Sequence, residues 1–389
     1  MDPRAVQIAA LSSGWRTDRA QEEQILQILR VVPRGELDAV LADLDLDKVI
    51  GDVDDHLWGP DHRTQLLDLL LQDRREELST PTLARVIASL HAGPTPRGHQ
   101  EAIAGVLLAL RGRRFHDLKY RLNTARDHHD LEHLVFRDLE EDLQEQVLEH
   151  IAEQAAAHPT SDLRVLCDID DTVRCALHDD RYPRGTVYPG VVELLTQLDQ
   201  GAAADPGRVG DLTFVTARPG GPAGLVEEYT RDGLAELGLP PHAVLGGSLL
   251  NLHTKAAIAE RKLQNMERDH LLFPECRMVF IGDSGQADGD VGAQMAARPH
   301  DHVAGTLLHD VTGLDAQARA DWAARGVHVF DTYAGAAAHA HRLGLLTADQ
   351  AQQVARATRT GLELLDLDPQ QREHLEVVLS DEEASLRIR

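Results

Sequence analysis

Short apolar runs alternate with helical segments throughout the second half of the 389-residue chain, and this alternation constrains the fold more than any other feature. Runs of this length separated by helices are typical of a mostly parallel sheet that helices cover on both faces. In such sheets ligands bind beyond the carboxyl ends of the strands, so polar residues that follow the runs are the candidate site. The runs read RVLCDID, LTFVTARP, HAVLGGSLL, CRMVFIGDS, VAGTLLHD and GVHVFDT.

The first half of the chain has apolar residues at helical spacing and few β-branched runs. We therefore expect an all-α domain over residues 1–158. A loose internal repeat is visible, because Gly14-x-x-Thr17 before an apolar helix is echoed by Gly93-x-Thr95 before another. The domain is predicted to contain two degenerate repeats.

Pro159 and the small polar residues around it interrupt the helical pattern and predict a linker. We expect a Rossmann-like α/β domain over residues 159–334, followed by a helical extension over 335–389 that carries no obvious chemical group. The only notable basic cluster lies in the helical half, and a cluster of this kind is most often a solvated helix face. It comprises Arg111, Arg113, Arg114, Lys119 and Arg121.

Charge and hydropathy exclude some classes of function. The formal net charge is −25, which opposes binding to nucleic acid through long-range repulsion. No run of 18 apolar residues occurs and the N-terminus lacks the features of a signal peptide, so we expect a soluble, cytoplasmic protein. The three cysteines, Cys167, Cys175 and Cys276, lack metal-site spacing and are expected to be reduced thiols in or near the core.

The first apolar run ends in Asp168-Ile169-Asp170. Strand alternation places the two aspartates on one side of the chain. Two carboxylates this close repel each other unless a cation or hydrogen bonds compensate their charge. The pair therefore predicts a metal ion.

Later runs supply further polar groups in a fixed order. Thr216 ends the second run, Lys255 lies at the expected start of a helix, and the fourth run leads into a glycine turn with Asp283 and Asp288. Each group alone has a simpler explanation as a cap, a surface residue or a polar loop. Their order and their placement after apolar strands favour one shared site.

The segments DIDDTV, FVTARP, the Lys255 region and GDSGQAD resemble the four motifs of the haloacid-dehalogenase superfamily over roughly residues 163–310. Together with Tyr188-Pro189-Gly190, they are most similar to the phosphatidate phosphatases of the actin-patch-protein type, which are related to the lipin catalytic domain. The resemblance implies a phosphatase with a capless Rossmann-like domain that works through an aspartyl-phosphate intermediate and Mg²⁺. Substrate identity does not follow from it.

The resemblance also implies roles for individual residues. Asp168 would be the nucleophile and Asp170 the general acid and base. Thr216 would hydrogen-bond the phosphoryl group, and Lys255 would offset the negative charge, with Lys262 as the alternative lysine. The substrate-binding residues would be Thr172 and Arg218. The Mg²⁺ ligands would be Asp168, Asp170 through its carbonyl, Asp283 and Asp288.

Only 48 residues separate Asp168 from Thr216 and 39 separate Thr216 from Lys255, which leaves little room for an inserted cap domain. Capless members of the superfamily usually act on bulky substrates, so phosphatidate is the first substrate to test. The alternatives are a phosphoprotein phosphatase and a non-catalytic lipid-binding or scaffold protein. These hypotheses also include peripheral contact with a membrane and a protein partner that binds the helical half.

Overall fold

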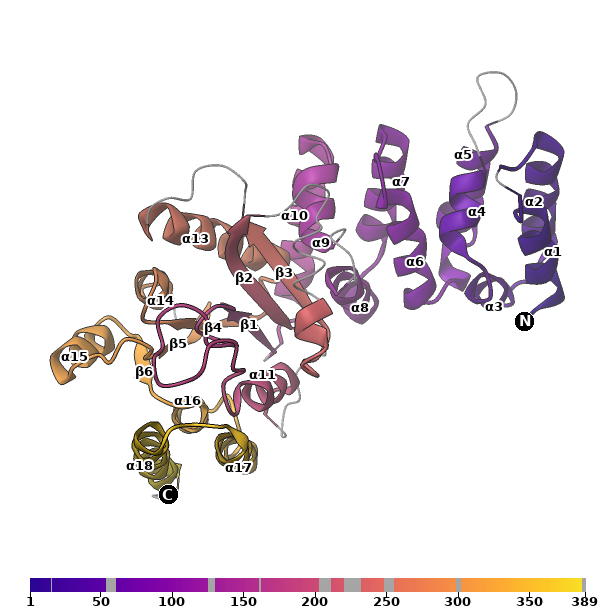
Figure 1. The fold of residues 1–389 in the computed structure, drawn as a ribbon. Helices are drawn as coiled ribbons and strands as arrows, with labels where there is room; N and C mark the ends of the chain where they lie inside the picture. The colour runs from indigo at the N-terminus through magenta and orange to yellow at the C-terminus, as the bar shows by residue number, and fades with distance from the viewer. Residues whose placement is uncertain are drawn as a thin grey trace. The chain divides into compact units, whose positions relative to one another are not determined.

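The computed structural model describes the chain from Met1 to Leu386, apart from residues 15, 54–60, 125–129, 161, 203–210, 220–231, 248–254 and 299–301. The chain divides into two compact units, Met1–Ala157 and His158–Arg389, which Figure 1 shows in indigo to magenta and in magenta to yellow. Among the described residues, no helix is long and apolar enough to cross a membrane.

The described part of the first unit is helical, as its apolar spacing predicts. Aliphatic side chains on one face of each helix are buried; in the second helix these are Ile25, Leu26 and Leu29. The same helix starts with a capping box formed by Asp18 and Gln21. The α-helices are α1 (Pro3–Leu11), α2 (Arg19–Val31), α3 (Leu37–Ala42), α4 (Leu46–Asp52), α5 (His62–Leu67), α6 (Thr80–His91), α7 (Arg97–Ala109), α8 (Gly112–Asn123), α9 (Leu131–His133) and α10 (Glu141–Ala157).

Each half of this unit contains a π-helical turn. Asp68–Asp73 continues α5 and Leu134–Asp138 continues α9, and a long helix follows each turn. π-Helical turns are rare in proteins, but these two start 66 residues apart, whereas Gly14 and Gly93 of the predicted repeat lie 79 residues apart, so the turns do not test the repeat. The repeat remains a prediction.

The basic cluster at and within α8 is only partly exposed: Arg111, Arg113 and Arg121 are exposed, whereas Arg114 is half-buried and Lys119 is buried. The Lys119 side chain is buried, and Arg114 donates to the Leu78 carbonyl at 2.6 Å and to Glu76 at 2.8 Å. Arg113, by contrast, is 91% exposed. The cluster is therefore not one continuous solvated basic face.

The second unit contains a six-stranded sheet in which every pairing is parallel, which confirms the predicted α/β class. The strand order is β3-β2-β1-β4-β5-β6, so the chain reverses its direction of travel across the sheet between β1 and β4. The strands are β1 (Leu163–Cys167), β2 (Leu212–Pro219), β3 (His242–Gly247), β4 (Arg277–Asp283), β5 (Val303–His309) and β6 (His328–Phe330).

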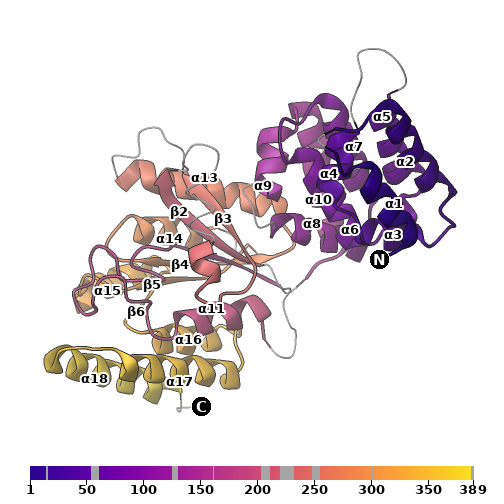
Figure 2. The same ribbon diagram turned by 45° about the vertical axis from the view of Figure 1, so that its right-hand side comes forward.

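Helices cover both faces of this sheet (Figure 2). Side chains alternate along β1, so that Val165 and Cys167 face one core and Leu166 faces the other. The core around Leu166 includes α13 (Lys255–Leu272) and α14 (Asp288–Ala296). The opposite core includes α11 (Val191–Gln200), α16 (Tyr333–Arg342), α17 (Ala348–Leu364) and α18 (Pro369–Leu386), while α15 (Ala316–Ala324) precedes β6.

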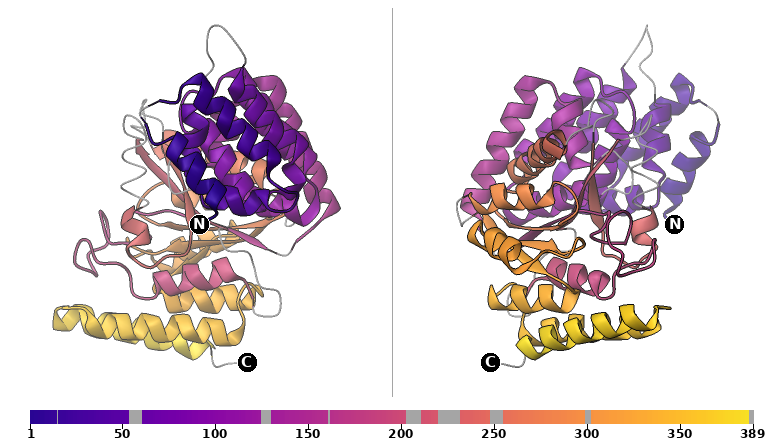
Figure 3. Two further views of the ribbon diagram at one scale, coloured as in Figure 1. Left: turned by 90° about the vertical axis from the view of Figure 1, so that its right-hand side faces the viewer. Right: turned by 60° about the vertical axis from the view of Figure 1, so that its left-hand side comes forward.

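The C-terminal helices are part of the second unit's main core. Leu375 and Leu379 of α18 are fully buried and belong to the same apolar cluster as the strand residues. Figure 3 shows α17 and α18 as the layer farthest from the sheet on this side. The predicted boundary between residues 334 and 335 falls inside α16.

The three cysteines are free and buried, as expected for reduced core thiols.

Candidate active site

The carboxyl ends of β1 and β4 meet at the point where the strand order reverses. Asp168 directly follows β1, and its backbone N–H donates to the carbonyl oxygen of Ile281 in β4 at 2.9 Å. Asp283 is the last residue of β4. Parallel sheets usually bind their ligands in the crevice at such a reversal. The topology therefore brings Asp168 and Asp283, two predicted site residues, to the place where a ligand is expected to bind.

Asp168, Asp283 and Asp288 form one buried group, which we call the acid cluster. One carboxylate oxygen from each of the three lies within 4.8 Å of the other two. Asp288 is the first residue of α14, and its Oδ2 accepts the backbone N–H of Asp283 at 3.4 Å. The acid cluster therefore joins the ends of two strands to the start of one helix.

Lys262 supplies the positive charge beside the acid cluster. Its Nζ lies 2.7 Å from Oδ1 of Asp168 and 2.5 Å from Oδ1 of Asp288, and its side chain is almost fully buried. When ionised, three carboxylates against one ammonium leave two negative charges uncompensated.

This charge imbalance shifts the pKa values of the residues in the site. Burial, together with the negative charge of Asp288, raises the pKa of Asp168 to about 7 even though Lys262 acts in the opposite direction. Burial also raises the pKa of Asp283 well above its ordinary value, with Asp288 and Asp168 adding to the effect. Although burial alone would lower the pKa of Lys262, Asp168 and Asp288 raise it.

The acid cluster fits a metal ion. Oδ2 of Asp168 and Oδ2 of Asp283 are buried and accept no hydrogen bond from the described residues. Buried carboxylate oxygens without a donor are costly, and an all-oxygen set of ligands suits a hard divalent cation. A divalent cation would also cancel the two uncompensated charges.

A strained turn connects Asp168 to the residues that follow it. Asp171 has a φ of 60°, the only positive φ of a non-glycine among the described residues. Such a conformation costs about 1–3 kcal/mol and persists only where the surroundings impose it. Here the Asp171 carboxylate accepts the backbone N–H groups of Ala176 at 2.7 Å, Leu177 at 2.9 Å and His178 at 2.8 Å.

Asp171, His178 and Asp283 form a second group with metal-compatible spacing. The Asp171 oxygens are already occupied by backbone N–H groups and by Nδ1 of His178 at 2.8 Å. Since Asp283 also belongs to the acid cluster, this second group supports the turn and is a poorer metal site. No signal in the sequence distinguished Asp171 and His178 from ordinary loop residues.

The remaining predicted residues lie at or near the same edge of the sheet. Asp170 is half-buried in the turn and Thr172 is fully buried. Thr216 and Arg218 lie in β2, the strand next to β1, but their side chains are outside the described part of the structure.

The structure places the two candidate lysines differently. Lys255 is the first residue of α13, and its side chain is outside the described part. Lys262 lies seven residues further along the same helix and contacts the acid cluster. Residues at this spacing share one helix face, which is why the sequence alone left both open.

The fold and the family match together define a phosphatase with a parallel α/β sheet, and the acid cluster is its candidate active site. Residues 163–310 match the family model described as the catalytic domain of phosphatidate phosphatase APP1, and they form a lipin-like phosphatase domain of the haloacid-dehalogenase type. The match runs from the start of β1 to the residue after β5 and contains the whole acid cluster. No curated protein and no solved structure gives a significant match.

Gly282 provides a test of the acid cluster. A Cβ at this position would lie 2.5 Å from Oδ2 and 2.6 Å from Cβ of Asp288, so Gly282→Ala must push Asp288 away from β4. We predict a loss of at least about tenfold in kcat/KM for an aryl phosphate, because displacements of about 1 Å at reacting groups have effects of this size.

Gly292→Ala in α14 is the matched control, since its Cβ would meet neighbours only at 3.5 Å or more. It should keep activity within about twofold of the unmodified protein. Equal activity of both variants would show that close approach of Asp288 is not needed.

Proposed function

We propose that the protein is a Mg²⁺-dependent phosphomonoester hydrolase that acts through an aspartyl-phosphate on Asp168. The observation that carries the proposal is the acid cluster with Lys262 at the meeting point of β1 and β4, inside the segment that matches a phosphatase catalytic domain. A buried group of three carboxylates beside one lysine, which carries two surplus negative charges when ionised, has no evident structural benefit, whereas a phosphatase needs such a group to hold its metal ion.

The proposed Mg²⁺ ligands are carboxylate oxygens of Asp168 and Asp283 and the main-chain carbonyl of Asp170, with Asp288 supporting them. Mg²⁺ prefers oxygen ligands and commonly binds substrate phosphates through one or two carboxylates. When bound, it would neutralise the site and allow a phosphate dianion to approach the aspartates.

In the first step a carboxylate oxygen of Asp168 attacks phosphorus and forms the acyl phosphate, and the P–O bond to the alcohol breaks. The leaving oxygen takes its proton from the carboxylic acid of Asp170, which becomes a carboxylate. Lys262 holds Oδ1 of Asp168 at 2.7 Å and so restricts rotation of the carboxylate. We assign the catalytic lysine role to Lys262 on this contact.

In the second step Asp170 removes a proton from water, whose oxygen attacks phosphorus. The P–O bond to Asp168 breaks, inorganic phosphate leaves, and the Asp168 carboxylate and the Asp170 acid are both restored. Thr216 and Arg218 of β2 are proposed to bind the phosphoryl oxygens, and Thr172 to orient the turn that carries Asp170.

Phosphatidate is the substrate that we propose. Two observations support it: the matched family model describes a phosphatidate phosphatase, and an apolar side chain is exposed beside the site. Leu177 is 57% exposed, and its backbone N–H is held by Asp171 in the turn after the nucleophile. An exposed leucine at this place could contact an acyl chain or a lipid surface.

We further propose a cytoplasmic location, which suits three free buried thiols, and a docking role for the helical unit toward a protein partner. The catalytic unit would then comprise the segment from residue 158 onward, with its C-terminal helices included.

Phosphate release from an aryl phosphate and from phosphatidate in mixed micelles, with and without Mg²⁺, tests the reaction. Asp168→Asn and Lys262→Met should each lower kcat by at least about a thousandfold, because they remove the nucleophile and its charge partner. Lys255→Met is the matched control in the same helix and should keep most of the activity. Turnover by Asp168→Asn, or loss of activity in Lys255→Met alone, would refute these roles.

The same assay distinguishes the alternatives. Turnover of phosphopeptides but not phosphatidate would favour a phosphoprotein phosphatase. Mg²⁺ and phosphatidate binding without any turnover would favour a lipid-binding module.

The lipid proposal has its own test in Leu177→Asp. We expect at least a fivefold loss of activity on micellar phosphatidate and no change on a soluble aryl phosphate, because only the micelle meets this side chain. Leu271→Asp is the matched control: Leu271 is 49% exposed near the end of α13, which leads into the start of β4 at the opposite edge of the sheet. Equal losses on both substrates for Leu177→Asp would contradict a role in lipid contact.

A further inference from the structure

A tyrosine beyond the matched catalytic segment reaches the turn that carries the catalytic aspartates. The family match ends at residue 310, whereas Tyr333 is the first residue of α16. Its hydroxyl donates a hydrogen bond to the carbonyl oxygen of Thr172, which is 161 residues away in the sequence, and its side chain is 1% exposed. The helices after residue 330 therefore contribute directly to the geometry of the active site.

A second side chain holds the neighbouring carbonyl group. Nδ1 of His309 lies 3.1 Å from the carbonyl oxygen of Asp171 and must donate a proton to it. The His309 ring stacks on Phe330 with a centroid separation of 5.2 Å, and Phe330 meets Tyr333 edge-on at 5.3 Å. These contacts form a rigid aromatic support under the strained turn.

Tyr333 is itself fixed by the last helix. The Glu382 carboxylate of α18 accepts hydrogen bonds from the backbone N–H of Asp331 at 3.1 Å and from that of Thr332 at 3.2 Å. It also accepts a hydrogen bond from the Thr332 hydroxyl. These groups lie at the N-terminus of α16, where free N–H groups favour a carboxylate. Glu382 thereby fixes the end of the helix from which Tyr333 projects.

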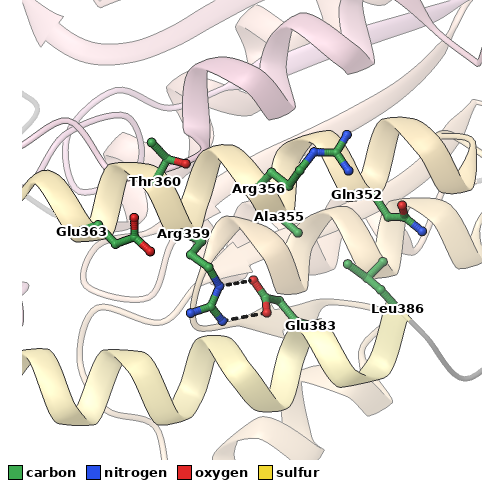
Figure 4. Close-up of a pocket in the computed structure, with 8 residues that line it drawn as sticks. All are labelled: Gln352, Ala355, Arg356, Arg359, Thr360, Glu363, Glu383 and Leu386. Carbon is green, nitrogen blue, oxygen red and sulfur yellow. Dashed lines mark hydrogen bonds and ion pairs between the residues drawn. The ribbon is translucent and has the colours of Figure 1, made fainter.

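The position of α18 is fixed in turn against α17. Arg359 of α17 makes a two-pronged ion pair with Glu383, at 2.9 Å and 2.7 Å, across the groove between the two helices (Figure 4). Two adjacent residues of α18 therefore bind different helices. Glu382 binds the start of α16, and Glu383 binds the side of α17. Burial of Leu375 and Leu379 holds the same helix to the core.

We propose that Tyr333 is a positioning residue of the phosphatase, which holds the turn between Asp168 and Thr172 in its strained conformation through the Thr172 carbonyl. Glu382 supports it by fixing the start of α16. The inference rests on the proposed function, because the turn matters only if Asp168 and Asp170 carry the reaction. Groups that react need placement within about 0.5 Å, which a turn with one unfavourable φ does not provide alone.

Tyr333→Phe removes one hydroxyl and leaves the aromatic packing in place. We expect kcat to fall about tenfold or more, while KM stays within about twofold, since the residues of β2 that are proposed to bind the phosphoryl group lie outside the turn. Tyr188→Phe is the matched control, because Tyr188 packs in the same aromatic cluster and, among the described residues, its hydroxyl makes no hydrogen bond to the turn. It should behave like the unmodified protein, and Glu382→Gln should show a smaller fall in kcat than Tyr333→Phe.

Amide hydrogen exchange supplies a readout that needs no turnover. The peptide covering residues 169–178 should exchange at least about tenfold faster in Tyr333→Phe than in Tyr188→Phe, because the turn loses one of its anchors. Unchanged exchange and unchanged kcat would overturn the positioning role, as would equal effects of the two variants. If the unmodified protein hydrolyses no phosphate ester, the proposed function fails, and the exchange difference alone decides whether Tyr333 holds the turn.

Discussion

The interaction on which the rest of the site depends is the contact of Lys262 with Asp168 and Asp288. A buried ammonium between carboxylates is stable only when every partner is held in place, because removing one leaves an uncompensated buried charge. Here the partners come from the end of β1 and the start of α14, and Lys262 comes from the middle of α13. The two ion pairs of Lys262 thus connect β1, α13 and α14 at the carboxyl edge of the sheet. Asp283 adds a further negative charge, which a metal ion would balance.

The turn after β1 combines strain with several anchors. Asp171 adopts a conformation that L-residues avoid, and backbone N–H groups, His309 and the hydrogen bond from Tyr333 to the next carbonyl hold it there. Strained backbone that many contacts maintain is common where function requires one exact geometry. This explains why helices far along the chain, which carry no chemical group of their own in the acid cluster, are packed so closely under the turn.

Much of the sheet and the acid cluster could be predicted from the sequence, because parallel strands bring their carboxyl ends to one edge. That rule placed Asp168 and Asp283 together from apolar runs more than 100 residues apart. The choice between Lys255 and Lys262 could not be made, since both lie on one helix face. Nothing in the sequence pointed to Tyr333, because an aromatic residue at a helix start is indistinguishable from ordinary core, and its partner is a backbone carbonyl with no sequence signature.

Isothermal titration calorimetry of Mg²⁺ into the full chain, beside Asp283→Asn, tests the central claim that the acid cluster is a metal centre. The account predicts one Mg²⁺ bound per chain and an affinity at least about tenfold weaker in the variant, which lacks one of the surplus charges. No Mg²⁺ binding by the unmodified protein, or equal binding by the variant, would contradict it.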